Sequence, residues 1–314
     1  MIFWRIVDNE LHNVDNVERL GFEESEGLFI PDEHLEEQNF MVMRTAHGIG
    51  DWGIISAMPR LLKEKYPNCK VYIPSTRLLE KLFGEWRQNW GTWANPFENV
   101  QYIFANNPYV DGVKDYFLGE VFHDHYRTYD KNNKGIPLIK QMLKFWQFEE
   151  KEYEDYYPDL FFSQEEIEMG DEIISKYLGS DNFGGLLITN RFESNGGRYD
   201  EEGNRMIMNH LLEVCDDLPF FFWTYNTPQK ISVKFNECFD MRNITTRLQL
   251  YIRTKAKINI GNHCGFLDCV SRYSNVFQIQ RTFPLNQNTI ECENYVNKEN
   301  LKEKLDVLKK SVFE

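Results

Sequence analysis

Two short stretches of the sequence combine glycine with side chains that could do chemistry. The first runs from His47 to Asp51 and places two glycines before an aspartate, at the start of a predicted helix. Glycine lets the backbone approach a ligand closely, and the amino end of a helix favours negative charge on that ligand. The second runs from His263 to Gly265, where backbone N–H groups at a helix start favour a pyrophosphate. We therefore expect the function to lie around these two stretches.

Each of these candidates also has a purely structural interpretation. Asp51 could take a proton from a hydroxyl group, or it could cap the helix. His47 could contact a ligand or satisfy backbone groups of its turn, and Gly265 could be needed only for packing. Asp268, on the second predicted helix, could face ribose or sugar hydroxyls, or solvent. No base is visible beside Cys264, which disfavours a nucleophilic cysteine.

Three arginines could serve an anionic ligand. Arg191 and Arg198 lie in the polar loop that follows Thr189. There they would stabilise a diphosphate leaving group as its charge develops, or they are ordinary surface arginines. Arg127 lies in a polar segment with two lysines, where a solvated loop is the favoured interpretation and an anionic acceptor the alternative.

The sequence gives little support to a metal site. His123 and His125 flank an aspartate and would share one face of a strand, but two ligands without a third are weak evidence. The six cysteines are scattered and form no CxxC pair. We therefore expect no metal and reduced thiols, as in a cytoplasmic protein.

The composition excludes several classes of function. A chain of 314 residues predicts two domains, and a hydrophobic content of 42% supplies a core. The net charge of −14 argues against a nucleic-acid binder, whose affinity would depend on neutralising phosphates. No apolar run approaches the ~20 residues that span a bilayer, and the N-terminal segment becomes acidic too soon for a secretory signal. We expect a cytoplasmic protein.

Apolar runs and helical segments alternate around the first stretch. Residues 40–43 form an apolar run before the glycine turn, and residues 71–73 form the next one. Between them, apolar residues recur at helical spacing from Trp52 to Tyr66, which predicts one long helix. Strand, helix and strand in this order predict a parallel sheet. A helix capped by Ser75 is predicted to end at Phe83, and residues 100–104 are a predicted strand.

The second half repeats the alternation. Ser163 and Glu166 form a predicted capping box for a helix to Leu178, and residues 179–184 are a predicted hinge. Residues 219–223 are apolar throughout, which predicts a central strand in a covered sheet. Other predicted elements are strands at 185–189, 257–260 and 276–279 and a helix capped by Thr246. The predicted division is an extension (1–38) and two doubly wound domains (39–180 and 181–314).

Residues 47–67 resemble the opening of the ADP-heptose:lipopolysaccharide heptosyltransferases, glycosyltransferase family 9. That family begins with a strand, a Gly-x-Gly-Asp turn and a helix that contains a proline before an xLLxxLKxxYP segment. A proline ordinarily costs a helix interior ~3 kcal/mol, so Pro59 at the family's position is informative. Residues 245–268 resemble the second signature, in which a T-S/T-L-x-x-L helix precedes a strand and a D-T/S-G-x-x-H turn. The resemblance covers roughly Phe40 to Ile279.

The resemblance implies an α/β protein of the GT-B class, with two Rossmann-like domains facing a cleft. It implies an acceptor on the N-terminal domain, a nucleotide-sugar on the C-terminal domain, and neither metal nor cofactor. The absence of an Asp-x-Asp triplet agrees with this class. Asp51 then becomes the general base. The acceptor would contact His47, Gly48, Gly50 and Arg127, and the donor Thr189, Arg191, Arg198, His263, Cys264, Gly265 and Asp268.

Three positions depart from the family. The aspartate of its D-T-G turn is His263 here, the following histidine is Asp268, and a loop lysine has become Gly197. Heptose as the sugar is therefore not supported. The sequence predicts an inverting transferase acting on a glycan or lipid-linked acceptor, and a lipid-linked one would bring the enzyme to a membrane surface. The alternatives are a sugar-nucleotide epimerase of the same fold and a non-catalytic nucleotide- or sugar-binding protein.

Overall fold

Two compact units make up the chain in the computed structural model. The structure describes residues 2–5, 28–29, 39–44, 47–90, 95–115, 120–124, 158–179, 182–188, 220–224, 244–262, 265–279, 289–292 and 303. The first unit comprises residues 1–132 and 139–161, and the second comprises residues 133–138 and 162–314. Among the helices in the described ranges, none has the length and apolar character needed to cross a lipid bilayer.

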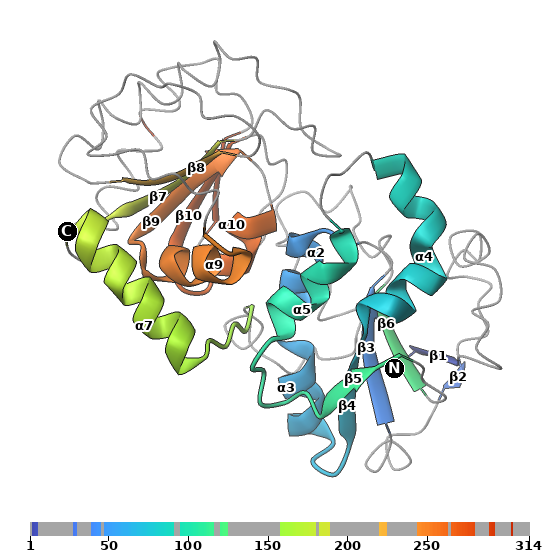
Figure 1. Cartoon of the computed structure of the whole chain (residues 1–314). Helices are drawn as coiled ribbons and strands as arrows, with labels where there is room; N and C mark the ends of the chain where they lie inside the picture. The colour runs from blue at the N-terminus through green and yellow to red at the C-terminus, as the bar shows by residue number, and fades with distance from the viewer. Residues whose placement is uncertain are drawn as a thin grey trace. The chain divides into compact units, whose positions relative to one another are not determined.

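A six-stranded sheet forms the first unit (Figure 1). Its spatial order is β2 (Leu28–Phe29), β1 (Ile2–Arg5), β6 (Glu120–Asp124), β3 (Asn39–Arg44), β4 (Lys70–Pro74) and β5 (Gly112–Lys114). The four strands from β6 to β5 are parallel, as predicted, whereas β1 runs antiparallel to both of its neighbours. The predicted extension 1–38 thus supplies two strands to the sheet. Residues 40–43 of β3 are fully or almost fully buried and form part of the core.

The single helix predicted from Trp52 to Tyr66 is wrong, because the segment forms two helices. They are α2 (Ile49–Ile54) and α3 (Met58–Lys65), joined by a turn that contains the buried Ser56. Pro59 lies in the first turn of α3, where a missing backbone N–H removes no helical hydrogen bond. Pro59 therefore fits the first turn of α3 without breaking either helix.

The strand predicted at residues 100–104 is also wrong. This segment is α5 (Asn99–Phe104), which follows a 3₁₀ turn, η2 (Pro96–Glu98). Val100, Ile103 and Phe104 are buried at the i, i+3, i+4 spacing of one helical face.

The predicted cap at Ser75 is confirmed. The Ser75 hydroxyl accepts a hydrogen bond from the Leu78 backbone N–H at 3.0 Å, at the start of α4 (Thr76–Trp90). The helix continues well beyond the predicted end at Phe83.

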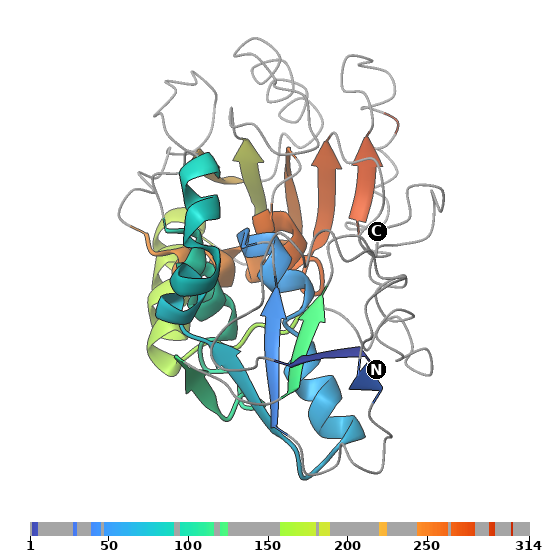
Figure 2. The same cartoon turned by 90° about the vertical axis from the view of Figure 1, so that its right-hand side faces the viewer.

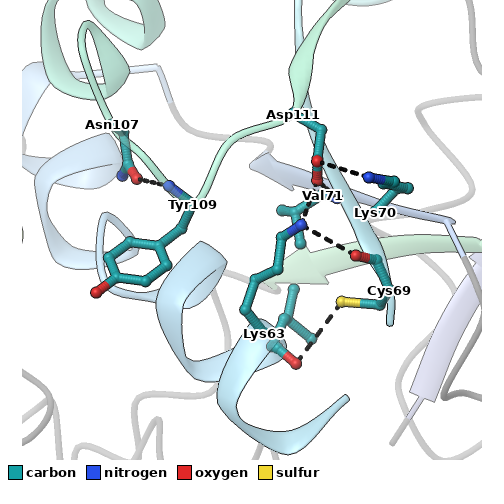
Figure 3. A network of polar contacts seen from close by, with 8 residues as sticks. Lys63, Cys69, Lys70, Val71, Asn107, Tyr109 and Asp111 are labelled. Atoms are coloured by element: carbon teal, nitrogen blue, oxygen red, sulfur yellow. Dashed lines mark hydrogen bonds and ion pairs between the residues drawn. The ribbon is translucent and has the colours of Figure 1, made fainter. Parts of the chain in front are cut away.

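One carboxylate organises the amino end of β4 (Figure 3). Asp111 accepts hydrogen bonds from the Val71 backbone N–H at 2.8 Å and from Lys63 Nζ at 2.6 Å, and it lies 3.3 Å from Lys70 Nζ. Lys63 also donates to the Cys69 carbonyl at 3.0 Å. The network joins α3, β4 and the segment before β5 at the end of the sheet opposite the predicted site.

The second unit contains a five-stranded sheet in which all strands are parallel. Its spatial order is β11 (Thr289–Cys292), β10 (Asn275–Ile279), β9 (Ile258–Asn262), β7 (Gly184–Ile188) and β8 (Phe220–Thr224). In chain order this is the 2-1-3-4-5 arrangement of doubly wound folds. All the predicted strands of this half are confirmed. Within the described sheet, however, β8 lies at an edge rather than at the predicted centre.

Helix α7 (Gln164–Ile173) packs on α9 (Thr246–Lys255) and belongs to the second unit (Figure 1). The predicted capping box is confirmed, with the Ser163 N–H donating to Glu166 Oε2 at 2.8 Å and the Glu166 N–H donating to Ser163 Oγ at 3.2 Å. Glu166 also forms a two-pronged ion pair with Arg247 of α9, at 2.7 and 2.8 Å. The predicted boundary at residue 180 differs from this division, since it leaves α7 with the first sheet.

A close approach between α7 and α9 explains a glycine inside α7. A Cβ atom on Gly170 would lie 2.1 Å from the ring of Tyr251, and the Tyr251 hydroxyl donates to Asp171 at 2.6 Å. The last turn of α7 continues as a π-helical segment, η5 (Ile174–Leu178). Helix α9 is capped by Thr245, one residue before the predicted Thr246.

Candidate active site

The first predicted stretch lies where the strand order of the first sheet reverses. From β3 the chain proceeds through β4 and β5 on one side and then returns to β6 on the other, and β3 and β6 point the same way side by side (Figure 2). Ligands of open α/β sheets bind outside the carboxyl ends of the strands at such a point. The register pairs Arg44, the last residue of β3, with Asp124 of β6. The His47–Asp51 stretch follows β3 and enters α2.

Both carboxylate oxygens of Asp51 are engaged. Oδ2 accepts a hydrogen bond from the Gly48 N–H at 3.0 Å, and Oδ1 lies 3.5 Å from Arg44 Nη2. Arg44 Nη1 also donates to the backbone carbonyl of Asp51. The Arg44 side chain is 5% exposed and the Asp51 side chain 25%. The carboxylate therefore helps to cap α2, is stabilised in its ionised form, and still reaches solvent.

Gly48 is required by the position of this carboxylate. Its φ of −62° is open to any residue, but a Cβ atom there would lie 2.6 Å from Asp51 Oδ2. Gly50 is buried within α2. Any larger residue at position 48 would displace the Asp51 side chain from its hydrogen bond.

The His47 imidazole lies inside an aromatic cluster. Its ring centroid is 4.7 Å from that of Phe83, 4.9 Å from Phe97 and 6.0 Å from Trp52. Neither ring nitrogen has a hydrogen-bond partner among the described residues. Burial, and to a smaller extent the charge of Arg44, lowers the pKa of His47 to about 3, so the ring is neutral. An acceptor contact by this imidazole would require it to leave the cluster.

Replacing His47 by phenylalanine is expected to make the protein less sensitive to acid. The unfolded chain takes up a proton at this histidine below pH 6.5, whereas the folded chain does so only near pH 3, so stability falls as the pH is lowered through this window. Between pH 7 and pH 5 this histidine accounts for about 2 kcal/mol of lost stability. Urea unfolding of both proteins at the two pH values measures the difference. Equal losses in both would contradict the buried neutral ring.

The second unit has its own reversal of strand order, between β7 and β9. Gly265 begins α10 (Gly265–Val270), shortly after β9 ends. Asp268 is only 4% exposed, which excludes its solvent-facing alternative. Thr189 and His263 directly follow β7 and β9 in the sequence. The predicted residues that lie outside the described part of the chain are Arg127, Thr189, Arg191, Arg198, His263 and Cys264.

A buried polar network joins β7 and β9 at this reversal. Arg253 of α9 is fully buried and donates to the Leu186 carbonyl at 3.1 Å and to Asn259 Oδ1 at 3.2 Å. The Asn259 amide in turn donates to the Arg253 carbonyl and to Ser274 Oγ, both at 2.9 Å. A Cβ atom on Gly185 would lie 2.1 Å from Asn259 Oδ1. The glycine therefore makes room for the network beside β7.

Of the two histidines considered as metal ligands, His123 lies in β6, beside the reversal of strand order in the first sheet. His123 and Asp124 end β6, and His125 falls outside the described residues. Within the described ranges, no group of three or more His, Cys, Asp or Glu side chains is placed to hold a metal ion.

Arg44 was not predicted as a site residue. The only signal for it in the sequence is a cation that ends an otherwise apolar strand, since its contacts with Asp51 depend on the turn between them.

Comparison with known proteins reveals a shared fold. No protein-family model and no curated protein matches the sequence. Among solved structures, a glycosyltransferase family 9 protein from Veillonella parvula DSM 2008 aligns over 88% of this chain and 97% of its own, with a TM-score of 0.58 at 8% identity. The E. coli ADP-heptose LPS heptosyltransferase II aligns over 86% and 98%, with a TM-score of 0.50 at 10% identity. The predicted resemblance is confirmed at the level of the fold.

Proposed function

We propose that this protein is a glycosyltransferase that moves a sugar from a nucleotide-sugar to a hydroxyl group of a glycan or lipid-linked acceptor. The fold that it shares with two glycosyltransferases supports this class. The proposal includes the GT-B arrangement, in which the first unit binds the acceptor, the second unit binds the donor, and the two face a cleft. Each unit offers the carboxyl ends of parallel strands at a reversal of strand order, where ligands of such sheets bind.

The observation that carries the proposal is the Asp51 carboxylate, which is oriented by the Gly48 N–H and Arg44 and is partly exposed at the reversal of the first sheet. In the proposed reaction Asp51 takes the proton of the acceptor hydroxyl, and the oxygen attacks the anomeric carbon of the sugar. The bond from that carbon to the diphosphate breaks with inversion, and its electron pair leaves with the diphosphate.

The proposed donor side stabilises the leaving diphosphate without a metal ion or cofactor. Its charge would be met by Arg191 and Arg198 and by the backbone of residues 263–265. The buried Asp268 would accept hydrogen bonds from ribose or sugar hydroxyl groups. Because His263 and Asp268 replace the family's residues, the sugar is proposed to differ from heptose.

A panel of nucleotide-sugars tests the proposal. We expect one of the UDP-, GDP- or ADP-sugars to raise the melting temperature of the protein, and the same donor to yield a glycoside with free hydroxyl-bearing acceptors. NMR of the product should show the anomeric configuration opposite to that of the donor, and EDTA should leave the rate unchanged. Isomerisation of the donor without an acceptor would instead identify an epimerase, and binding without any product a non-catalytic protein. Either result overturns the proposal.

A further inference from the structure

We infer that Arg44 is the positioning residue for Asp51, a buried cation that fixes the orientation of the carboxylate and holds it ionised. The geometry stands by itself, and only the consequence for sugar transfer rests on the proposed function. Arg44 would act through Asp51 and would not itself touch the substrate.

The guanidinium group contacts Asp51 at two points. Nη1 donates to the backbone carbonyl of Asp51, and Nη2 lies 3.5 Å from its Oδ1. The other carboxylate oxygen accepts the Gly48 N–H at 3.0 Å. A rigid planar fork can reach a backbone oxygen and a side-chain oxygen together, which the single ammonium group of lysine does less well. Arg44 therefore sets the orientation as well as the charge of Asp51.

The two side chains of the Arg44–Asp51 pair differ in burial, and this difference shows that Arg44 supports Asp51. Arg44 follows four buried residues of β3, and its own side chain is only 5% exposed, so desolvation gives it a strong need for a counter-charge. Asp51 supplies that charge and remains 25% exposed. A fixed cation lies beneath a carboxylate that faces solvent.

In a second ion pair of the same unit, the carboxylate is more buried than the cation. Arg60 Nε lies 2.8 Å from Asp159 Oδ2, but there the carboxylate is 2% exposed and the cation 15%. The Asp159 carboxylate is thus buried and does not face solvent. The backbone N–H of Asp159 donates to Ser56 Oγ at 2.8 Å, which ties residue 159 to the turn between α2 and α3. The pair is suited to holding the chain in place, and it provides a matched control.

The first test measures ionisation of Asp51 and needs no substrate. Protein labelled with ¹³C at the aspartate carboxyl carbons is titrated by NMR, and the Asp51 signal is assigned by its loss in Asp51→Asn. We expect Arg44→Gln to raise the pH midpoint of this signal by about one unit or more, and Arg60→Gln to leave it unchanged. An unchanged midpoint in folded Arg44→Gln overturns the inference.

The second test separates charge from geometry. Arg44→Lys keeps the charge but not the fork, so it should keep the midpoint near that of the wild type while lowering kcat by roughly ten- to a hundredfold at unchanged donor KM. A wild-type kcat in Arg44→Lys overturns the positioning role. This test remains valid even if Arg44→Gln fails to fold. If the NMR midpoint shifts as expected but the wild type transfers no sugar, the proposed function fails and the inference about Arg44 stands.

Discussion

Replacing Asp51 by asparagine is expected to lower kcat for sugar transfer by about 10²–10⁴-fold while leaving the Kd for the donor unchanged. The amide has nearly the same shape as the carboxylate, and its oxygen can still accept the Gly48 N–H bond that caps α2. It cannot accept a proton at neutral pH. The substitution removes the proposed base and also the counter-charge of the buried Arg44, so circular dichroism must first show that the variant is folded. Steady-state kinetics together with donor titration then measures the two effects separately.

Asp111→Asn is the matched control for this experiment. Asp111 also accepts a backbone N–H bond, from Val71 at 2.8 Å, and also pairs with a cation, Lys63, but at the opposite end of the sheet. We expect this variant to keep the wild-type kcat. Equal activity of Asp51→Asn and Asp111→Asn would mean that Asp51 is only a helix cap.

Gly185→Ala is expected to destabilise the second unit by about 3 kcal/mol or more. The added methyl group would lie 2.1 Å from Asn259 Oδ1 and 2.9 Å from Arg253 Nη1, so the buried network must come apart. Arg253 is fully buried, and the loss of its partners leaves a charge with fewer hydrogen bonds in the interior. Urea unfolding followed by circular dichroism measures the change.

Gly84→Ala is the control for the same change of side chain. Gly84 lies within α4, and nothing lies within 4 Å of the Cβ atom that an alanine would add. Alanine there should stabilise the helix by roughly 0.5–1 kcal/mol. If Gly185→Ala proves as harmless as Gly84→Ala, the Arg253–Asn259 network does not have the importance that its burial suggests.

The parts of the fold that depend on local sequence could be predicted. The glycine turn before Asp51, the capping box at Ser163, strands β3 and β4 of the first sheet and strands β7 to β10 of the second have signals within a few residues, and the structure confirms them. The strand predicted at residues 100–104 is wrong because a short apolar run fits either the helical or the strand period, and the tertiary packing of Val100 and Ile103 decides between them.

The parts that depend on distant contacts could not be predicted. The edge position of β8 and the antiparallel β1 follow from which strands meet, and no short segment encodes that. Likewise, Gly170 in α7 would be read as a weak point of a helix, yet Tyr251, far along the chain, requires the space. At the site, Asp51 could be named from its turn, whereas Arg44 becomes visible only when the turn folds back on β3.

The placement of β1 has a consequence for the order of events during synthesis. β1 leaves the ribosome well before its sheet neighbour β6, which lies more than one hundred residues later in the chain. At ~5–20 residues per second, that interval lasts roughly six to twenty seconds. Of the two described strands that flank β1, β2 alone has been synthesised during this time, and the edge that β6 will cover is open to other chains. Pairing of β1 with β6 must therefore wait until the chain has grown past residue 124, and the uncovered edge of β1 is exposed to nascent-chain association in the meantime.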